Sequence, residues 1–431
     1  MARVVVVGGG LAGASSAARL AKLGHEVTLV ERLPSIGGAL GFVEEAGFRW
    51  DSGASSTTLP AALRDLFKKS GRPLERELDL VELPTIREHR FEDGSRVSLP
   101  ANSRSAQRDA IDDGLGTGLG DRWLTWTEGF AETWELLRKE YLERPYSPEH
   151  APKEVVSLIR DRPSLARAVT RLRDQRLKQI GLHHAITGGH DPRNVPWWLG
   201  FLHHVEQSFG VWTVPGGLGQ LAALLEKRLG ERGVTVLNGT TVEDVVTEGT
   251  FGVRTTSDTI PADIVVVAVD PRRLPSLEKY VARTMPALPP TVCHVGLDGD
   301  VPSLPHEVVL HGDATITINT TGTAPPGKAA WTISARGRLS EDLLRALARQ
   351  KIDIRGQVEC RVDRSARQQV EEYGGSPYGV LWQGRATITG QLLTRTPIPN
   401  VYAVGAHTTV SALTPFVALT SSLVADVVGP A

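Results

Sequence analysis

The stretch Val4-Val5-Val6-Val7-Gly8-Gly9-Gly10-Leu11-Ala12-Gly13 decides the fold of this chain. The run of valines predicts a parallel strand that is buried on both faces of its sheet. The small-residue segment 14–23 predicts a helix, so the pattern G-x-G-x-x-G stands between a strand and a helix. In this position it predicts a loop whose backbone and helix N-terminus hold the phosphates of a dinucleotide.

An acidic residue and two glycine segments distinguish FAD from NAD and NADP as the predicted dinucleotide. Residues 25–30 predict a second strand, and Glu31 at its end is placed to accept hydrogen bonds from ribose hydroxyl groups, which disfavours NADP. The glycine pair 37–38 follows soon after, whereas a chain that binds NAD usually proceeds directly to the next helix. Near the C-terminus, residues 401–404 predict a buried strand that ends at 405–406 before a helix. Two distant segments that enclose one long cofactor favour FAD.

The rest of the chain, which has 431 residues in all, predicts an insertion into this nucleotide-binding unit. Residues 105–185 have a mostly helical pattern, and residues 290–375 contain strand-like runs. The predicted fold class is therefore α/β, with a Rossmann-type FAD-binding domain and an inserted mixed helix/sheet substrate-binding domain. The FAD-binding domain is predicted from 1–100, 213–275 and 391–431, and the substrate-binding domain from 101–212 and 276–390.

Composition excludes several classes of protein. Lys and Arg number 48 against 49 Asp and Glu, and the net charge of -1 argues against a nucleic-acid partner. Cys293 and Cys360 are too few for a disulfide framework or a cysteine metal site. The first residues lack the pattern of a signal peptide, and the longest later apolar run, 264–269, is far shorter than a membrane span. We therefore expect a cytoplasmic protein, with its oligomeric state left open.

Several segments resemble flavin-containing amine oxidases and, more closely, the phytoene-desaturase-like branch of that superfamily. The resemblance is carried by 4–38, by 47–53, by the run Trp212-Thr213-Val214-Pro215-Gly216-Gly217 and by 396–406. It implies FAD that is bound non-covalently across two segments, and an apolar tunnel in the substrate-binding domain. It also implies that the flavin removes a hydride from an unactivated or allylic carbon, or from a carbon next to nitrogen.

The predicted cofactor-binding residues come from both ends of the chain. Two positions depart from the family that the chain resembles: Ala39 stands where Arg is common, and Phe416 replaces the Gly that follows Pro415. The predicted cofactor-binding residues are Gly8, Gly10, Leu11, Ala12, Gly13, Glu31, Arg32, Gly37, Gly38, Ala39, Leu40, Gly53, Ala54, Ser55, Val242, Gly405, Ala406, Pro415 and Phe416.

Histidines provide the candidates for catalysis. His407 follows the segment expected to face the flavin, and His204 is a second candidate proton acceptor, although a structural role is the ordinary one for both. The adjacent pairs His183-His184 and His203-His204 are not chelating motifs, because neighbours in a helix point apart. No metal site is therefore predicted.

Two further segments suit an apolar substrate. Trp197, Trp198, Phe201 and Trp212 are the predicted substrate contacts, although packing between the domains accounts for these aromatic residues equally well. Residues 153–180 combine basic side chains with apolar ones at helical spacing. This pattern predicts either a peripheral membrane face through which a lipophilic substrate enters, or an ordinary solvated helix.

The favoured function is an FAD-dependent oxidoreductase, a desaturase or dehydrogenase, that removes hydride from an apolar, isoprenoid or carotenoid-like substrate. The alternative is oxidation of an amine or an amino-acid-derived metabolite in secondary metabolism. A second alternative gives FAD a non-redox or isomerising role, because the loop 407–416 departs from the family pattern. In every case the expected partner is a small molecule.

Overall fold

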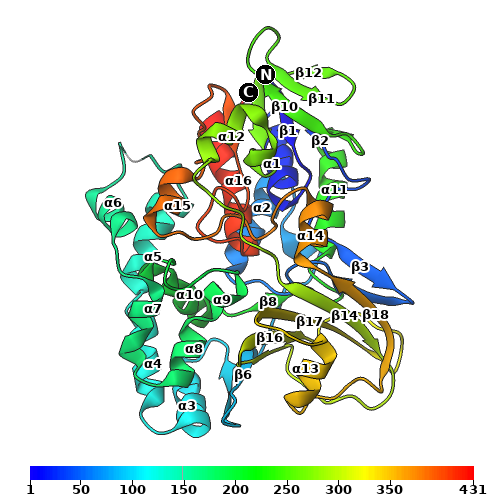
Figure 1. The fold of residues 1–431 in the computed structure, drawn as a ribbon. Helices are drawn as coiled ribbons and strands as arrows, with labels where there is room; N and C mark the ends of the chain where they lie inside the picture. Colours follow the sequence, from blue (N-terminus) through cyan, green and yellow to red (C-terminus); the bar gives the residue numbers. More distant parts are fainter. Residues whose placement is uncertain (148) are drawn as a thin grey trace.

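The structure, a computed structural model, describes residues 1–147 and 149–431 (Figure 1). A five-stranded parallel sheet in the order β19-β13-β1-β2-β9 contains the predicted first strand at its centre. Val4 and Val6 belong to the apolar core on one face of this sheet, whereas Val5 and Val7 belong to the core on the other. The valine run is therefore buried on both faces, as predicted. The strands are β1 (Arg3–Val7), β2 (Glu26–Val30), β9 (Thr235–Leu237), β13 (Ile264–Val267) and β19 (Val401–Ala403).

Helices cover one face of the parallel sheet, and a small antiparallel sheet covers the other. Helix α1 (Leu11–Lys22) packs against three further helices and shares their apolar core. These helices are α2 (Pro60–Ser70), α11 (Gln220–Glu231) and α16 (Thr414–Val428). The antiparallel sheet consists of β10 (Val242–Val246), β11 (Gly252–Thr255) and β12 (Thr259–Pro261). The loop between β1 and α1 thereby connects the parallel sheet to the layer of helices.

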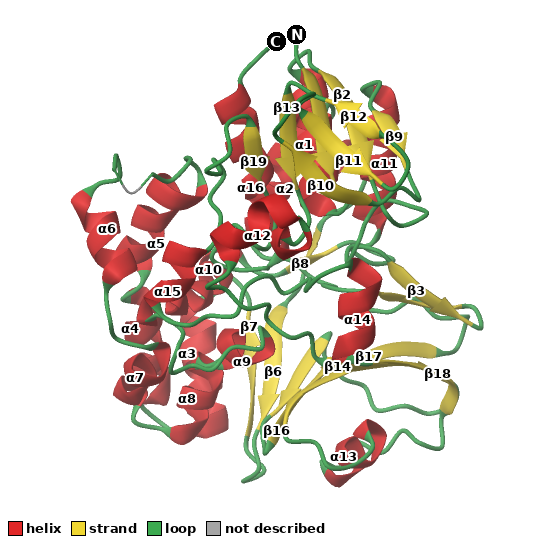
Figure 2. Cartoon of the chain, turned by 45° about the horizontal axis from the view of Figure 1, so that its top comes forward, coloured by secondary structure: helices red, strands yellow, loops and turns green. Residues whose placement is uncertain are grey.

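A seven-stranded sheet lies at the opposite end of the molecule from the parallel sheet (Figure 2). Its strand order is β18-β14-β17-β16-β15-β6-β7. Ile316, Ile318 and Ile333 lie in an apolar core shared with α13 (Leu343–Arg349), so the residues between them face the other side. The strands are β6 (Thr85–Arg90), β7 (Arg96–Pro100), β14 (Thr291–Leu297), β15 (Glu307–Leu310), β16 (Ala314–Asn319), β17 (Ala329–Gly337) and β18 (Val358–Arg364).

Short helices from the middle of the chain form a layer beside the two sheets (Figures 1 and 2). They are α3 (Arg104–Leu115), α4 (Leu119–Glu128), α5 (Ala131–Leu137), α6 (Lys153–Arg160), α7 (Leu165–Ala168), α8 (Gln175–Gly181), α9 (His183–Thr187) and α10 (Phe201–Phe209). The remaining elements are β3 (Phe42–Glu45), β4 (Phe48–Asp51), β5 (Val81–Glu82), β8 (Trp212–Thr213), α12 (Pro275–Val281), α14 (Ala366–Tyr373) and α15 (Arg385–Gly390).

Strands β6 and β7 differ from the predicted division of the chain. The prediction assigns residues 85–100 to the FAD-binding domain, but both strands belong to the seven-stranded sheet, where β6 pairs in parallel with β15. The physical reason is that a local pattern specifies a hairpin without specifying the distant strand beside it. The other boundaries of the two domains stay a prediction.

The basic stretch 153–180 is divided among several short helices. Its apolar residues Leu165, Val169, Leu172 and Ile180 are buried in the core of the helical layer. The exposed side chains of the stretch include basic ones such as Arg160, together with the acidic Glu154 and Asp161. Within 1–147 and 149–431, no helix combines the length and the apolar character that crossing a bilayer requires.

Candidate active site

One cavity of about 480 Å³ extends from the glycine loop to the seven-stranded sheet. Its walls come from segments that are far apart in the chain. They include the β1–α1 loop, the glycine pair 37–38, the segment 51–58 and the C-terminal segment 405–415. The cavity also reaches α9, α10 and one face of the seven-stranded sheet. It therefore connects the predicted cofactor-binding segments to the predicted substrate-binding part.

The backbone around Gly10 fits a phosphate group. Gly10 is the N-cap of α1, and among the described residues no side chain caps this helix terminus. A Cβ atom added at Gly10 would meet none of the described atoms within 4 Å. By contrast, a Cβ atom at Gly13 would lie 1.9 Å from the carbonyl oxygen of Gly8, so Gly13 is needed for helix packing. The loop thus presents backbone N–H groups to an anion, as a dinucleotide requires.

Glu31 stabilises the glycine loop and faces the cavity. Its Oε2 atom accepts a hydrogen bond from the backbone N–H of Gly9 at 2.5 Å, and its Oε1 atom accepts one from Leu33 at 2.7 Å. The residue is buried but lines the cavity wall. Since a carboxylate has about four acceptor positions, it can also accept hydrogen bonds from a ribose. This arrangement fits the role predicted for Glu31.

Most of the predicted cofactor-binding residues line the cavity. They are Gly8, Gly10, Leu11, Ala12, Glu31, Gly37, Gly38, Ala39, Leu40, Gly53, Ala54, Ser55, Gly405, Ala406 and Pro415. The structure thus brings both ends of the chain to one wall, as the prediction of a long cofactor requires. Their contacts with FAD stay a prediction.

Four of the predicted cofactor-binding residues lie outside the described cavity wall. Gly13 lies behind the loop, and Val242 packs in the core between the parallel sheet and the antiparallel sheet. Arg32 points to the end of α14, where it donates a hydrogen bond to the carbonyl oxygen of Glu372. Phe416 is fully buried against the helical layer. Gly13 thus serves the packing of helix against strand, and the side chains of Arg32, Val242 and Phe416 make helix or core contacts.

Asp51 is an acidic residue of the cavity wall that the sequence analysis did not select. It stands at the end of β4 and accepts a hydrogen bond from the backbone N–H of Gly219 at 2.8 Å. Burial raises the pKa of Asp51 to about 6, although this hydrogen bond acts in the opposite direction. The carboxyl group therefore titrates within the range in which enzymes usually operate.

His407 lies in the cavity wall directly after Ala406, as predicted. Burial lowers the pKa of His407. Arg272 lies next to it, with the guanidinium Nη2 atom 3.5 Å from the Nδ1 atom of His407. Asp270 holds Arg272 through two hydrogen bonds of 2.9 Å. The surroundings thus favour a neutral imidazole, which can hold or accept a proton, and a role for His407 in catalysis stays a prediction.

His204, the second predicted catalytic histidine, lies outside the described cavity wall, unlike His407. Among the described atoms, its Nε2 atom lies 3.5 Å from the hydroxyl oxygen of Ser208, one turn further along α10. Glu206 of the same helix lines the cavity, whereas His204 does not appear in the described wall. Positions two apart on a helix face different directions, which explains the difference. The position of His204 therefore argues against contact with the flavin.

The predicted substrate contacts also lie outside the described cavity wall. Trp198 and Phe201 are fully buried in the helical core. The indole N–H groups of Trp197 and Trp212 donate hydrogen bonds to Asp161 and to the carbonyl oxygen of Phe209, at 2.8 and 2.7 Å. Packing within the helical layer accounts for the positions of Trp197, Trp198 and Phe201. Packing between the domains was the alternative to substrate contact for these residues. Leu199 and Leu202 of the same region line the cavity instead.

The sheet wall of the cavity is polar, although the opposite face of the same sheet is apolar. The cavity-lining residues of β16 and β17 are Thr315, Thr317, Asn319, Thr332, Ser334 and Arg336. The residues between them lie in the apolar core or pack against it. The strict alternation of apolar and polar residues in 314–319 and 331–336 was the sequence signal for this wall.

A buried cluster of charged side chains stands at one edge of the polar wall. The guanidinium group of Arg87 donates to both carboxylate oxygens of Glu206, at 2.5 and 2.9 Å. Its Nε atom donates to Glu307 at 2.7 Å. Burial alone would raise the pKa of Glu206, but Arg87 and His184 outweigh it and hold this pKa well below its ordinary value. The cluster joins β6, α10 and β15, and the sequence analysis did not predict it.

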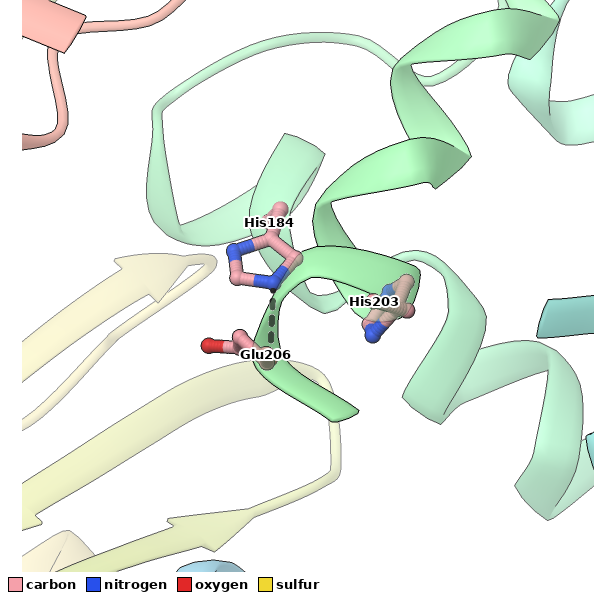
Figure 3. A group of neighbouring side chains, drawn as sticks. All are labelled: His184, His203 and Glu206. Carbon is pink, nitrogen blue, oxygen red and sulfur yellow. Dashed lines mark ion pairs between the residues drawn. The ribbon is translucent and has the colours of Figure 1, made fainter. Parts of the chain in front are cut away.

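Figure 3 shows that His184, His203 and Glu206 meet where α9 and α10 approach each other. The Nε2 atom of His184 lies 3.0 Å from Glu206, while the Nε2 atom of His203 lies 3.2 Å from the carbonyl oxygen of Gly181. The positively charged guanidinium group of Arg87 already donates hydrogen bonds to both carboxylate oxygens of Glu206. This arrangement disfavours a cation at the cluster, and the expectation of no metal stays a prediction.

Comparison with known proteins identifies the class to which this fold and site belong. Residues 11–415 match the family described as flavin containing amine oxidoreductase, and the chain belongs to this family. The predicted resemblance, the α/β fold class and FAD as the cofactor are thereby confirmed. The predicted class of enzyme, an FAD-dependent oxidoreductase, is confirmed by the same assignment.

The similar proteins include carotenoid enzymes and an amine oxidase. The chain is 28% identical to a 4,4'-diapolycopene oxygenase of Methylomonas sp over 72% of its length and 66% of that relative. It is 28% identical to a phytoene desaturase (neurosporene-forming) of Cereibacter sphaeroides over 62% of its length and 53% of that relative. The solved cyclohexylamine oxidase of Brevibacterium oxydans covers 99% of this chain, which covers 98% of that oxidase, with a TM-score of 0.68 and 17% identity. The matches thus span less than two thirds of the two carotenoid relatives.

Proposed function

We propose that this protein is an FAD-dependent oxidoreductase that removes hydride from an isoprenoid substrate. The observation that carries the proposal is the single cavity that joins the glycine loop, the 405–415 segment and the seven-stranded sheet. A cofactor that spans the glycine loop and the 405–415 segment would end near the seven-stranded sheet, where a substrate would lie. The names of the two carotenoid relatives support an isoprenoid as the substrate class.

Each wall of the cavity has a distinct part in this proposal. The N-terminus of α1 binds the phosphate groups, and Glu31 binds the ribose. Bound FAD supplies the acceptor for the hydride and its two electrons. Leu199, Leu202 and Val410 exclude water from the side of the cavity that faces the helical layer. His407, held beside Arg272, is placed to keep or accept a proton at its imidazole.

Oxidation of an amine is a second candidate function. The specific observation in its favour is the pair of carboxylate groups, those of Glu206 and Glu307, beside the seven-stranded sheet in the described cavity wall. A carboxylate stabilises the ammonium form of an amine. Arg87 is bonded to both groups, however, and offsets part of their negative charge.

Anaerobic bleaching of the flavin absorbance tests the proposed function. The purified FAD-loaded protein is mixed with phytoene or diapophytoene in detergent micelles and, separately, with cyclohexylamine and putrescine. Bleaching by an isoprenoid is the expected result. Bleaching by the amines alone would replace the proposal with the second candidate. A flavin that chemical reductants bleach, but no member of either panel does, would favour a non-redox or isomerising role.

We further propose that contact with a membrane surface, where it occurs, is electrostatic and uses the exposed arginines of 153–180. The apolar residues of this stretch are buried, so the basic side chains remain for an anionic surface. The test is co-sedimentation with phosphatidylcholine vesicles that contain phosphatidylserine, at low and high salt. Binding should disappear at high salt and in the variant Arg160→Glu/Arg167→Glu/Arg171→Glu. Binding that resists salt, or equal binding to neutral vesicles, would contradict the proposal.

A further inference from the structure

The cavity has two chemically different sides. On the side of the seven-stranded sheet, Glu307, Asn319, Thr332 and His294 lie opposite one another on the successive strands β15, β16, β17 and β14. All of them line the cavity, and so do Thr317 and the other hydroxyl groups of the wall described above. The facing side contains Leu199, Leu202, Val211, Val410 and Leu413. Asn319, Thr332 and Glu307 have hydrogen-bond partners within the protein. A wholly apolar substrate would still leave the other polar atoms of this side without partners, which is energetically costly.

Several polar atoms of the cavity wall, on the sheet and on the neighbouring α9, have no partner within the described part of the chain. The Nε2 atom of His294 and the Nδ1 atom of His183 are both buried and without a hydrogen bond there. Glu307 uses its Oε1 atom for Arg87, and no hydrogen bond to its Oε2 atom is found among the described residues. Buried polar groups in proteins are nearly always paired. The two buried imidazole nitrogen atoms therefore indicate a bound polar group, and the Oε2 atom of Glu307 can accept a hydrogen bond from it.

The cluster around Glu307 determines the kind of polar group. Arg87 offsets the negative charge of the carboxylates, which weakens the site for a cation. His183 stands next to Glu307, with its Nε2 atom 3.8 Å from Oε1, so a hydrogen-bond donor and an acceptor lie close together. A hydroxyl group can donate to the carboxylate and accept from the imidazole at the same time, whereas an ammonium group can only donate.

The polar wall is also linked to the predicted cofactor wall. The Nδ2 atom of Asn319 donates to the hydroxyl oxygen of Ser55 at 2.5 Å. Ser55 belongs to the predicted cofactor-binding residues and lines the cavity. A molecule held along the row from Glu307 to His294 would therefore lie close to the region assigned to the cofactor.

We propose that the substrate is amphipathic and that its hydroxyl group binds at Glu307, with its apolar body against the leucine and valine side of the cavity. This inference rests on the proposed function for the isoprenoid class of the substrate. It adds a binding site for an alcohol group, formed by Glu307 and His183 and continued by Thr317 along the sheet.

Three probes with the same C15 isoprenoid skeleton test the proposal. Farnesol and farnesylamine differ only in the terminal group, and farnesene is a hydrocarbon that ends in a conjugated diene. Their dissociation constants are measured on the FAD-loaded protein from the change in the flavin absorbance spectrum, with calorimetry as a second readout. We expect farnesol to bind about tenfold more tightly than farnesene and more tightly than farnesylamine. Equal binding of farnesol and farnesene, tighter binding of the amine, or no binding of farnesol would overturn the proposal.

Isosteric variants show which residues cause the preference for farnesol over farnesene. Glu307→Gln and Thr317→Val should each reduce the preference for farnesol over farnesene to less than about threefold. The matched controls Glu243→Gln and Thr259→Val change exposed strand residues and should leave the preference unchanged. An unchanged preference in Glu307→Gln would overturn the assignment to this carboxylate. Thermal unfolding of each variant shows whether it has kept its fold.

Failure of this inference can be distinguished from failure of the proposed function. If farnesol binds preferentially but no isoprenoid bleaches the flavin anaerobically, the alcohol site stands and the proposed reaction fails. If isoprenoids bleach the flavin but the hydroxyl group gives no advantage in binding, the reaction stands and the alcohol site fails.

Discussion

Glu31 stabilises the glycine loop and is also the residue predicted to bind the ribose of the cofactor. Its carboxylate accepts hydrogen bonds from the backbone of Gly9 and Leu33 and lines the cavity. We expect Glu31→Ala to weaken FAD binding at least about tenfold, because both the loop and the ribose lose an acceptor. The measurement is the FAD content after gel filtration, followed by titration of FAD into the stripped protein. Glu248→Ala, an exposed change, is the control, and full flavin occupancy in Glu31→Ala would refute the assignment.

Asp51 should make the stability of the protein depend on pH. Burial raises its pKa from 3.8 to about 6, so the folded state holds the proton more tightly than the unfolded state. The resulting stabilisation is fully present below about pH 4 and is lost as the pH rises through about 6. It corresponds to about 3 kcal/mol in the free energy of unfolding.

The variant Asp51→Asn isolates this effect, because the amide can still accept the hydrogen bond from Gly219 but does not titrate. Urea unfolding between pH 4 and pH 7.5 should show a smaller loss of stability with rising pH in the variant than in the wild-type protein. Asp79→Asn, at an exposed position, should follow the wild-type curve. Parallel curves for Asp51→Asn and the wild type would show that the pKa of Asp51 is not raised.

At the scale of the element, two glycines at the start of α1 are expected to have different roles: Gly10 in FAD binding and Gly13 in the stability of the fold. Gly10→Ala adds a methyl group toward the cavity, where it meets none of the described atoms within 4 Å, so the FAD-free protein should melt near the wild-type temperature but bind FAD poorly. Gly13→Ala adds the group 1.9 Å from the carbonyl oxygen of Gly8. It should destabilise the FAD-free protein by about 1–3 kcal/mol.

Differential scanning fluorimetry of the FAD-free variants, together with FAD titration, distinguishes these two effects. A large loss of thermal stability in Gly10→Ala would indicate that Gly10 is required for packing. Normal FAD binding in Gly10→Ala would show that the phosphate groups do not approach the backbone at this residue.

Elements differ in how well the sequence predicts them. The periodicity of β1 and α1 is local, and both elements lie where the pattern predicts. For the aromatic residues Trp198 and Phe201, no feature of the local sequence distinguishes a substrate contact from core packing. Both choices bury the same apolar area, and only the arrangement of neighbouring helices decides between them. The predicted substrate contacts therefore lie outside the described cavity wall, whereas the glycine loop is part of it.

At the scale of the whole molecule, Arg87 joins the seven-stranded sheet to the helical layer. It pairs with Glu206 of α10 and with Glu307 of β15, and all three side chains are largely buried. We expect Arg87→Ala to lower the free energy of unfolding by about 3–5 kcal/mol, because it leaves two carboxylates without their cation. Arg3→Ala removes an exposed ion pair with Asp263, which solvent screens, and should change the stability little. Urea unfolding compares the two variants, and similar losses in both would contradict the role given to Arg87.

The sequence by itself determined the parallel strand, the glycine loop, the acidic residue after the second strand and the choice of FAD. Each of these depends on residue types at short, regular spacing, where the chain geometry alone sets which atoms meet. The meeting of Arg87, Glu206 and Glu307 was decided only by the tertiary structure, since these residues are separated by more than 100 positions in the chain. Contacts of that kind arise when packed layers bury charges together, and no local periodicity encodes which distant partner will neutralise them.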